Sequence, residues 1–337
     1  DTDLSDLEIT YLNATDRHTL MSILKRHNKT FYREDENLSF TNKVKHAIHT
    51  QDDIPVYAKL YRYPEVHKRE INRQIYEMLR QGIIRESSSP YNSPIWIVPK
   101  KLDATGIQKW RLVIDYRKLN GITIEDRFPI PNIDDIFDKL GRCQYFTTLD
   151  LAQGFHQIEM DERDIHKTAF STANGHYEFL RMPFGLKNAP STFQRLMNEV
   201  LREHIGKICL VYLDDILIFS TSVEEHIESL DKVLNCLTKA NLKIQLGKCS
   251  FLKQETEFLG HLVTNNGIKP NPKKVEAIDK ILLPTNQREI KSFLGITGYY
   301  RRFIKDYSKV AHPLVKYLKK NARINLKERI IETHLRN

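Results

Sequence analysis

The sequence predicts an α+β protein, in which a sheet is covered by helices on one face and followed by a helical appendage. Three observations support this fold class. Strand-like and helix-like segments follow one another in the order β, α, β-β, α, β. Apolar runs flank Asp214 and Asp215, as in a β-hairpin with a tight turn. Two amphipathic segments, 286–305 and 308–319, close the patterned part of the chain.

The first third of the chain begins with a polar segment. Residues 1–54 are mixed in charge, and we expect a lead-in with little core of its own. Apolar residues recur at helical spacing from Val66 to Arg80, and Gly82 ends this predicted helix. A loop rich in Ser and Pro then leads into two apolar runs, which predict a hairpin over residues 95–116.

The middle of the chain alternates between extended and turn-forming residues. The β-branched and aromatic run 145–151 predicts a strand with Asp150 near its end. Asn174 and Gly175 form a strong turn signal between two further strands. A loop then leads into a helix that we expect to reach about Arg202. Beyond the Asp-Asp hairpin, the pattern predicts a helix at 224–240 and strands near 243–246 and 257–263.

The adjacent acids Asp214 and Asp215 are the first candidate functional residues. Two neighbouring carboxylates repel each other unless a cation lies between them, and hard oxygen donors favour Mg²⁺ or Mn²⁺. A solvated Asp-Asp turn is the alternative interpretation, and most such pairs are of that kind. If the strand that carries Asp150 belongs to the same sheet, three carboxylates can converge at one edge, which suffices for a site of two ions.

Composition and charge favour a polyanionic partner. The chain has 337 residues, of which 40% are hydrophobic and 28% are charged, and it contains neither a membrane-spanning apolar run nor a signal peptide. Its four cysteines lack metal-ligand spacing and predict reduced thiols. The net charge is +9, and residues 285–320 hold nine Lys or Arg against two acids, interleaved with tyrosines. This pattern suits a surface that follows a phosphate backbone, although a solvated basic helix is an equally good interpretation.

Seven motifs in one order resemble those of a known enzyme family. They are S-P-Y-N-S-P-I-W-I-V-P-K-K, K-W-R-L-V-I-D-Y-R-K-L-N, F-T-T-L-D-L-A-Q-G-F-H-Q-I, M-P-F-G-L-K-N-A-P-S-T-F, Y-L-D-D, F-L-G-H and F-L-G-I-T-G-Y-Y-R-R-F-I. A single four-residue motif would carry little weight, whereas seven in register are specific. From about Ile54 to Lys320, the chain resembles the reverse transcriptases of gypsy-class LTR retrotransposons.

The resemblance implies a right-hand polymerase fold with fingers, palm and thumb. It divides the chain into a lead-in after a protease region (1–54), fingers (55–124 and 159–188), palm (125–158 and 189–265), thumb (266–320) and a truncated tail (321–337). No protease, ribonuclease H or integrase signature is expected in this chain. The chain lacks an initiator Met, for which we expect either excision from a longer precursor or an artificially chosen boundary.

The resemblance also assigns a metal site. Asp150, Asp214 and Asp215 match the metal-binding catalytic acids, with Asp150 and Asp214 as direct ligands and the Leu151 carbonyl completing the coordination. Two Mg²⁺ ions are expected, for which Mn²⁺ can substitute. The ion itself would lower the pKa of the primer 3′-hydroxyl, so that no general base residue is required.

The same motifs assign a nucleotide pocket. Lys100 and Arg111 match the basic residues that clamp the incoming triphosphate, the alternative being solvated surface charges. Phe155 matches the bulky residue that excludes a 2′-hydroxyl, the alternative being a core Phe. Phe184 stands where retroviral enzymes usually carry Gln, which removes a hydrogen-bonding group and leaves packing against the nucleotide. The remaining residues assigned to this pocket are Leu151, Gln153 and Gly154.

Template and primer contacts are assigned to three further regions. Arg117 is expected along the template strand, the F-L-G-H motif resembles a primer grip, and the basic helix 287–304 resembles a thumb helix in the minor groove of a hybrid. The residues concerned are Arg117, Tyr212, Phe258, Leu259, Gly260, His261, Lys291, Gly295, Gly298, Arg301 and Arg302.

The function implied is that of an RNA-directed DNA polymerase in retrotransposon replication. Its expected partners are an RNA or DNA template with a DNA primer and dNTPs, together with a tRNA primer and other Pol products, and no membrane. The expected location is the cytoplasm, within virus-like particles, with entry into the nucleus. Two alternatives stay open: a silent remnant that still binds RNA–DNA hybrids, and a related RNA-copying polymerase, against which Phe155 speaks.

Overall fold

The computed structural model describes residues 4, 7–100, 106, 108–282 and 284–318. The chain divides into two compact units, Asp1–Gln254 and Glu255–Asn337. Each unit is described by itself. The predicted tail 321–337 lies outside the described residues. No helix in the described part of the chain is long and apolar enough to cross a bilayer.

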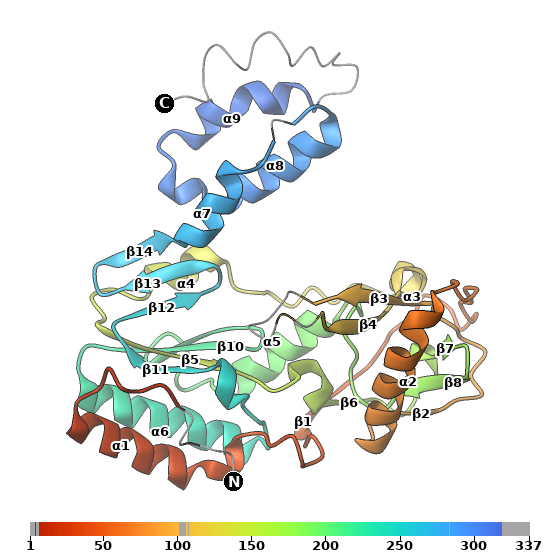
Figure 1. Cartoon of the computed structure of the whole chain (residues 1–337), viewed down its shortest axis with the longest axis horizontal. Helices are drawn as coiled ribbons and strands as arrows, with labels where there is room; N and C mark the ends of the chain where they lie inside the picture. Colours follow the sequence, from red (N-terminus) through yellow and green to blue (C-terminus); the bar gives the residue numbers. More distant parts are fainter. Residues whose placement is uncertain (1–3, 5–6, 101–105, 107, 283, 319–337) are drawn as a thin grey trace. The chain divides into compact units, whose positions relative to one another are not determined.

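A four-stranded antiparallel sheet forms the centre of the first unit (Figure 1). Its order is β11 (Ser250–Lys253), β5 (Tyr145–Asp150), β10 (Asp215–Ser220) and β9 (Cys209–Tyr212). Strands β9 and β10 form the predicted hairpin, and their last pair is Tyr212 with Asp215. The apolar residues of β10 are buried, which anchors the hairpin in the core.

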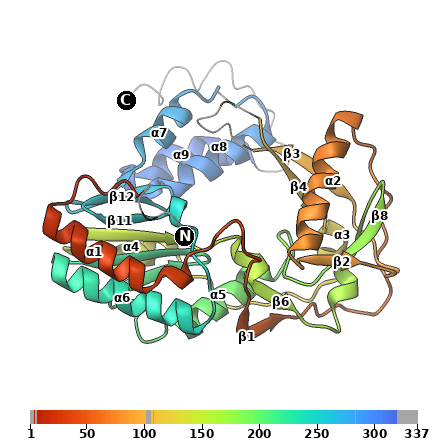
Figure 2. The same ribbon diagram turned by 60° about the horizontal axis from the view of Figure 1, so that its bottom comes forward.

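Three helices support this sheet. They are α1 (Ala14–Arg26), α5 (Ala189–Val200) and α6 (Val223–Lys239). Helix α6 packs against β5 and β10, and α5 packs against β9. Helix α1 lies beside α6 (Figure 1, Figure 2). The hydroxyl of Ser222 accepts from the Glu225 amide and caps α6 where its pattern predicted a helix start.

The N-terminal segment 1–54 is more than a lead-in, contrary to our expectation from its polarity. Leu20 and Leu24 of α1 are fully buried in the core of the first unit. Strand β1 (Thr41–His46) pairs in parallel with β6 (Ile158–Met160). The mixed charge hid this role, because only one face of α1 is apolar and the strand pairs with a segment more than 100 residues away.

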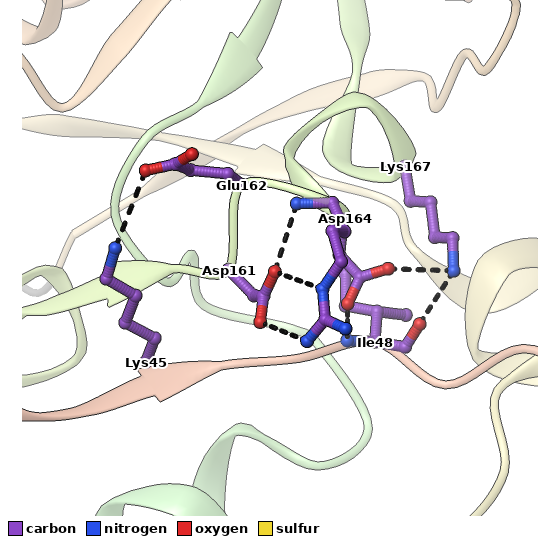
Figure 3. Close-up of polar contacts among 7 residues, drawn as sticks. Lys45, Ile48, Asp161, Glu162, Asp164 and Lys167 are labelled. Atoms are coloured by element: carbon purple, nitrogen blue, oxygen red, sulfur yellow. Dashed lines mark hydrogen bonds and ion pairs between the residues drawn. The ribbon is translucent and has the colours of Figure 1, made fainter.

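A buried ion pair secures the chain just after β1 (Figure 3). Lys167 lies 2.9 Å from Asp164, and both side chains are largely buried. The Ile48 amide donates to Asp164 at 2.8 Å, and the Lys167 ammonium donates to the Ile48 carbonyl at 2.8 Å. Both charges are therefore partnered and hydrogen-bonded, as buried charges require. At the surface nearby, Lys45 lies 3.7 Å from Glu162 (Figure 3).

The rest of the first unit is built from one long helix, two short helices and two small sheets. The elements are α2 (Glu65–Arg80), β2 (Ile84–Glu86), β3 (Ile95–Pro99), β4 (Trp110–Ile114), α3 (Arg117–Ile122), α4 (Ile133–Asp138), β7 (Phe170–Thr172) and β8 (Gly175–Phe179). Strands β3 and β4 form the hairpin predicted over 95–116, and β2, β8 and β7 form a second sheet. The turn before β8 falls at Ala173 and Asn174, because Thr172 pairs with Gly175.

The second unit is a three-stranded sheet followed by helices. Its elements are β12 (Glu255–Phe258), β13 (His261–Thr264), β14 (Gly267–Pro270), α7 (Pro272–Asp279), α8 (Gln287–Tyr299) and α9 (Tyr307–Lys316). The expected helix 286–305 ends earlier, at Tyr299, and a short 3₁₀ turn over Arg301–Phe303 follows. Residues 255–265, which we assigned to the palm, belong to this second unit.

Candidate active site

The ends of two neighbouring strands bring the three predicted acids together. Asp150 is the last residue of β5 and lies directly opposite Asp215, the first residue of β10. Directly opposite residues of an antiparallel pair project on the same face, so these two carboxylates share one side of the sheet. Asp214 lies in the adjoining turn, and its carbonyl accepts from the Leu151 amide at 3.4 Å. Asp150 and Asp215 are therefore neighbours at one edge of the sheet, and Asp214 adjoins them in the turn.

Burial and mutual repulsion make these carboxylates harder to ionise than ordinary acids. Burial raises the pKa of Asp215 to about 6, and the charges of Asp214 and Asp150 add to this effect. Burial likewise raises the pKa values of Asp214 and Asp150, while Lys248 opposes both shifts. Carboxylates in such surroundings are stabilised in their charged form by a cation.

Lys248 is a cationic neighbour that we did not predict. Its ammonium lies 3.6 Å from a carboxylate oxygen of Asp150, at the end of a 3₁₀ turn over Leu246–Lys248. The contact arises because the Gln245 amide donates to the Asp150 carbonyl, which fixes this turn beside β5. Nothing in the local sequence distinguishes Lys248 from a solvated surface lysine, so only the tertiary structure places it in the site.

The donor chemistry of the site fits a hard divalent cation. Across the described residues, no three His, Cys, Asp or Glu side chains converge closely enough to enclose an ion. Mg²⁺, however, keeps several of its waters and needs only one or two protein carboxylates together with substrate phosphates. Asp150, Asp214 and Asp215 supply such oxygens without a closed shell. The set therefore fits Mg²⁺ or Mn²⁺ better than a metal that prefers nitrogen or sulfur donors.

A tight turn follows β5 and packs against Asp214. Gln153 has a left-handed backbone, with φ of 47°, and begins a short 3₁₀ turn over Gly154–Gln157. A Cβ atom on Gly154 would lie 3.1 Å from the Cβ of Asp214 and 3.2 Å from its Oδ2. Glycine at this position therefore allows the turn to approach the carboxylate.

Phe155 projects from this turn into an aromatic cluster. Its ring stacks on Phe184, with centroids 4.9 Å apart and an interplanar angle of 21°, and packs on Phe193 at 5.5 Å. Phe184 is half exposed, and Gly185 follows it with φ of 93°. Phe155 is thus neither a fully buried core residue nor an isolated surface ring. We expected both Phe155 and Phe184 in the pocket, but sequence reasoning did not reveal that they stack on each other.

The two predicted triphosphate-clamping residues lie on one face of the β3–β4 hairpin. Arg111 pairs with Val98, and the Lys100 amide donates to the Lys109 carbonyl at 2.7 Å. Side chains alternate between faces along a strand, so Lys100 shares the face of Val98 and of its partner Arg111. Both are exposed. Most of the basic tip of the hairpin, residues 101–105 and 107, lies outside the described residues.

Arg117 and Tyr212, which we assigned to nucleic-acid contact, occupy different surroundings. The Arg117 side chain is exposed and donates to both carboxylate oxygens of Asp115, at 2.6 and 2.9 Å. This pairing holds the pKa of Asp115 below its usual range. Tyr212 is half-buried at the end of β9, next to the turn that carries Asp214. Arg117 thus presents its guanidinium at the surface in a fixed orientation.

In the second unit, the F-L-G-H motif forms the β12–β13 hairpin. Leu259 and Gly260 both have positive φ, 49° and 71°, as a two-residue hairpin turn of this kind requires. The hydroxyl of Tyr300 donates to the Gly260 carbonyl at 3.2 Å. Phe258 and His261 are buried, contrary to their expected place at a binding surface. The turn residues Leu259 and Gly260 are partly buried, and the exposed residues of this hairpin are Glu255 and Glu257 of β12.

Helix α8 carries the other predicted contacts of the second unit. Lys291 and Gly295 are exposed, and a Cβ on Gly295 would meet no atom within 4 Å. Gly298 instead faces α9, since its Cβ would lie 3.5 Å from the Tyr307 hydroxyl. Arg301 and Arg302 are exposed in the 3₁₀ turn after the helix. Four of the five predicted residues are thus exposed, and Gly298 serves packing between helices.

Comparison with known proteins gives three findings. Residues 98–263 match the family model described as reverse transcriptase (RNA-dependent DNA polymerase). The chain is 57% identical over 96% of its length to the retrovirus-related Pol polyprotein from transposon 297 of Drosophila melanogaster. It is 47% identical over 87% of its length to that from transposon gypsy of the same organism. The chain spans only 30% and 28% of these two relatives.

Solved structures of viral proteins share the fold. The structure of the foamy viral protease-reverse transcriptase in complex with RNA/DNA hybrid matches 91% of this chain and 41% of its own chain, with a TM-score of 0.80 and 26% identity. The same protein's dRH form in complex with double-stranded DNA matches 90% of this chain and 53% of its own, with a TM-score of 0.81 and 28% identity.

Proposed function

We propose, from the match of residues 98–263 to the reverse transcriptase family model, that the chain extends a DNA primer on an RNA or DNA template. The observation that carries the proposal is the meeting of Asp150, Asp214 and Asp215 at one edge of the central sheet. The similarity of the chain to Pol polyproteins of gypsy-class transposons supports a role in retrotransposon replication.

The proposed chemistry is phosphoryl transfer at a two-ion site. Asp150 and Asp214 would hold the ions, with Asp215 beside them and the Leu151 carbonyl as a further ligand. Bound Mg²⁺ supplies activation of the primer 3′-hydroxyl and neutralisation of the leaving group. The protein contributes position and charge, because phosphoryl transfer needs little other covalent chemistry from side chains.

The nucleotide pocket follows from the residues around these acids. Lys100 and Arg111, on one face of the β3–β4 hairpin, would bind the triphosphate oxygens of a dNTP. Phe155 would lie beneath the sugar and exclude a 2′-hydroxyl, with Phe184 stacked against it. Exposed cations and a partly exposed aromatic pair suit an anionic, ring-bearing substrate.

Template and primer are the proposed macromolecular partners. The foamy viral relatives were solved with an RNA/DNA hybrid and with double-stranded DNA, which supports the same class of ligand here. Arg117 in the first unit, and Lys291, Arg301 and Arg302 in the second, would contact phosphates. We further propose that a tRNA serves as primer and that other Pol products are partners of the chain. The proposed location is the cytoplasm, within virus-like particles.

Incorporation of dTTP on poly(rA)·oligo(dT) with Mg²⁺ or Mn²⁺ tests the proposed function. We expect activity in the parent chain and its loss in Asp214→Asn and in Asp150→Asn, with hybrid affinity largely retained, because binding rests on phosphate contacts elsewhere. Near-parental rates in either variant would contradict the metal assignment. An inactive parent that still binds hybrid would instead identify the chain as a silent binding protein.

A further inference from the structure

Gln194 of α5 is a fully buried polar residue with two well-formed hydrogen bonds. Its Oε1 accepts from the backbone amide of Leu213 at 2.8 Å, and its Nε2 donates to Oδ1 of Asn198 at 2.9 Å. Buried apolar residues of α5, among them Phe193 and Met197, lie beside it along the helix. A buried amide among them costs free energy unless its polar atoms find partners, and here both ends do.

The backbone that Gln194 contacts is the turn of the β9–β10 hairpin. Leu213 is the first of the two turn residues between Tyr212 and Asp215, and its φ is 54°. This left-handed conformation is unfavourable for a residue with a side chain, and glycine or asparagine usually occupies such positions. The amide of a turn residue has no partner in the strand ladder, so the Gln194 oxygen supplies one.

Asp214 is bonded directly to this residue along the chain. A change in the conformation of Leu213 would therefore rotate the peptide that leads into Asp214 and move its carboxylate relative to Asp150. On the other side, the backbone of Gly154 approaches Asp214 so closely that a Cβ there would lie 3.2 Å from Oδ2. The carboxylate thus lies between the turn that Gln194 holds and the backbone of the β5 turn.

We propose that Gln194 is a positioning residue for catalysis, which holds the strained Leu213 turn and thereby sets the place of the Asp214 carboxylate. This inference rests on the proposed function. Gln194 touches neither metal nor substrate in this role and acts only through the Leu213 amide. It differs from a core residue, whose loss would lower stability without a specific effect on the rate of the chemical step.

Gln194→Met removes the acceptor while keeping the length of the side chain. We expect kcat to fall about 10-fold, with KM for dTTP and affinity for the hybrid changed less than about twofold, because small displacements of a reacting group affect the rate strongly. The Mg²⁺ concentration needed for half-maximal activity should rise. Glu199→Gln, on the exposed side of the same helix, is the matched control and should leave all of these values unchanged.

A second background separates positioning from general packing. In Leu213→Gly, positive φ is no longer unfavourable, so the turn needs less support. Gln194→Met introduced there should lower kcat by less than about threefold, because the two sites are coupled through the turn. An equal reduction in both backgrounds would overturn the proposal, and so would unchanged kcat in the single variant.

Amide hydrogen exchange provides a readout that does not depend on activity. In parent protein labelled with ¹⁵N-leucine, the Leu213 resonance, assigned by its absence in Leu213→Gly, should exchange slowly although it lies in a turn. Rapid exchange in the parent protein would overturn the proposal even if Gln194→Met failed to fold. An inactive parent with a slowly exchanging Leu213 amide would refute the proposed polymerase function and leave the hydrogen bond to Gln194 established.

Discussion

His226 should make the first unit lose stability as the pH falls from 7 to 5. Its ring lies fully buried beneath the central sheet, between Thr147 of β5 and Ser220 of β10. Ser220 donates its hydroxyl proton to the Ser222 carbonyl, so it accepts from Nδ1–H of His226. Nε2 must then accept from the Thr147 hydroxyl, at 2.6 Å. Only the neutral imidazole satisfies both contacts.

Burial lowers the pKa of His226 to about 4 from its ordinary value of 6.5, and the nearby Glu225 opposes this shift only in part. Because the folded pKa is the lower one, the unfolded chain binds more protons between these two values, and acidification favours unfolding. The linkage relation gives a decrease of about 2 kcal/mol in the free energy of unfolding between pH 7 and pH 5 from this one group.

Urea unfolding followed by fluorescence measures this decrease, since both tryptophans, Trp96 and Trp110, lie in the first unit. His226→Gln keeps a donor and an acceptor but cannot titrate, so its decline from pH 7 to pH 5 should be smaller than the parent's by about 2 kcal/mol. His18→Gln removes an exposed histidine of α1 and serves as the control. A decline as steep in His226→Gln as in the parent would show that the fold does not disfavour the charged ring.

Three further perturbations test other parts of the site. Gly154→Ala places a methyl group 3.1 Å from the Cβ of Asp214, so single-turnover incorporation should slow by about 10- to 100-fold while hybrid affinity is unchanged. An unchanged rate would mean that the carboxylate has room to move. Phe155→Val removes the ring stacked on Phe184, so the ratio of kcat/KM for dNTP to kcat/KM for rNTP should fall by roughly 5- to 150-fold. An unchanged ratio would show that a residue other than Phe155 selects the sugar. Replacing Arg301 and Arg302 with Ala should flatten the plot of log K for hybrid binding against log salt concentration, by roughly 0.7 to 0.9 in slope for each phosphate that is no longer neutralised. An unchanged slope would show that these arginines do not bind the phosphate backbone of the hybrid.

The sequence predicted those features that local pattern determines. The Asp214–Asp215 hairpin and helix α6 follow from apolar runs or helical apolar spacing, bounded by turn and capping residues such as Ser222. The meeting of Asp150 with Asp215 depended on two strands sharing one sheet, which spacing alone could not establish. The family motifs made that arrangement an expectation, and the strand register places the two residues opposite each other.

Other features could not be predicted from the sequence, because their partners are distant along the chain. Strand β1 has a polar, mixed-charge sequence, and its pairing with β6 is visible only in the folded unit. Lys248 reaches Asp150 through a turn fixed by backbone contacts. The burial of Phe258 and His261 arises because the hairpin that carries them packs against Tyr300. Motifs identified these two residues by family position, and family position does not say which side chain is exposed.

Two buried polar side chains, His226 and Gln194, support different parts of the central sheet. His226 joins Thr147 in the middle of β5 to Ser220 at the end of β10, whereas Gln194 contacts the turn that carries Asp214. Removal of the His226 ring should loosen the whole sheet and lower the free energy of unfolding, because the buried Thr147 hydroxyl loses its acceptor and the buried Ser220 hydroxyl loses a donor. Removal of the Gln194 amide should move one carboxylate and lower kcat, because the strands on either side of the turn keep their ladder. Combining His226→Gln with Gln194→Met should therefore give additive effects, each in its own measurement.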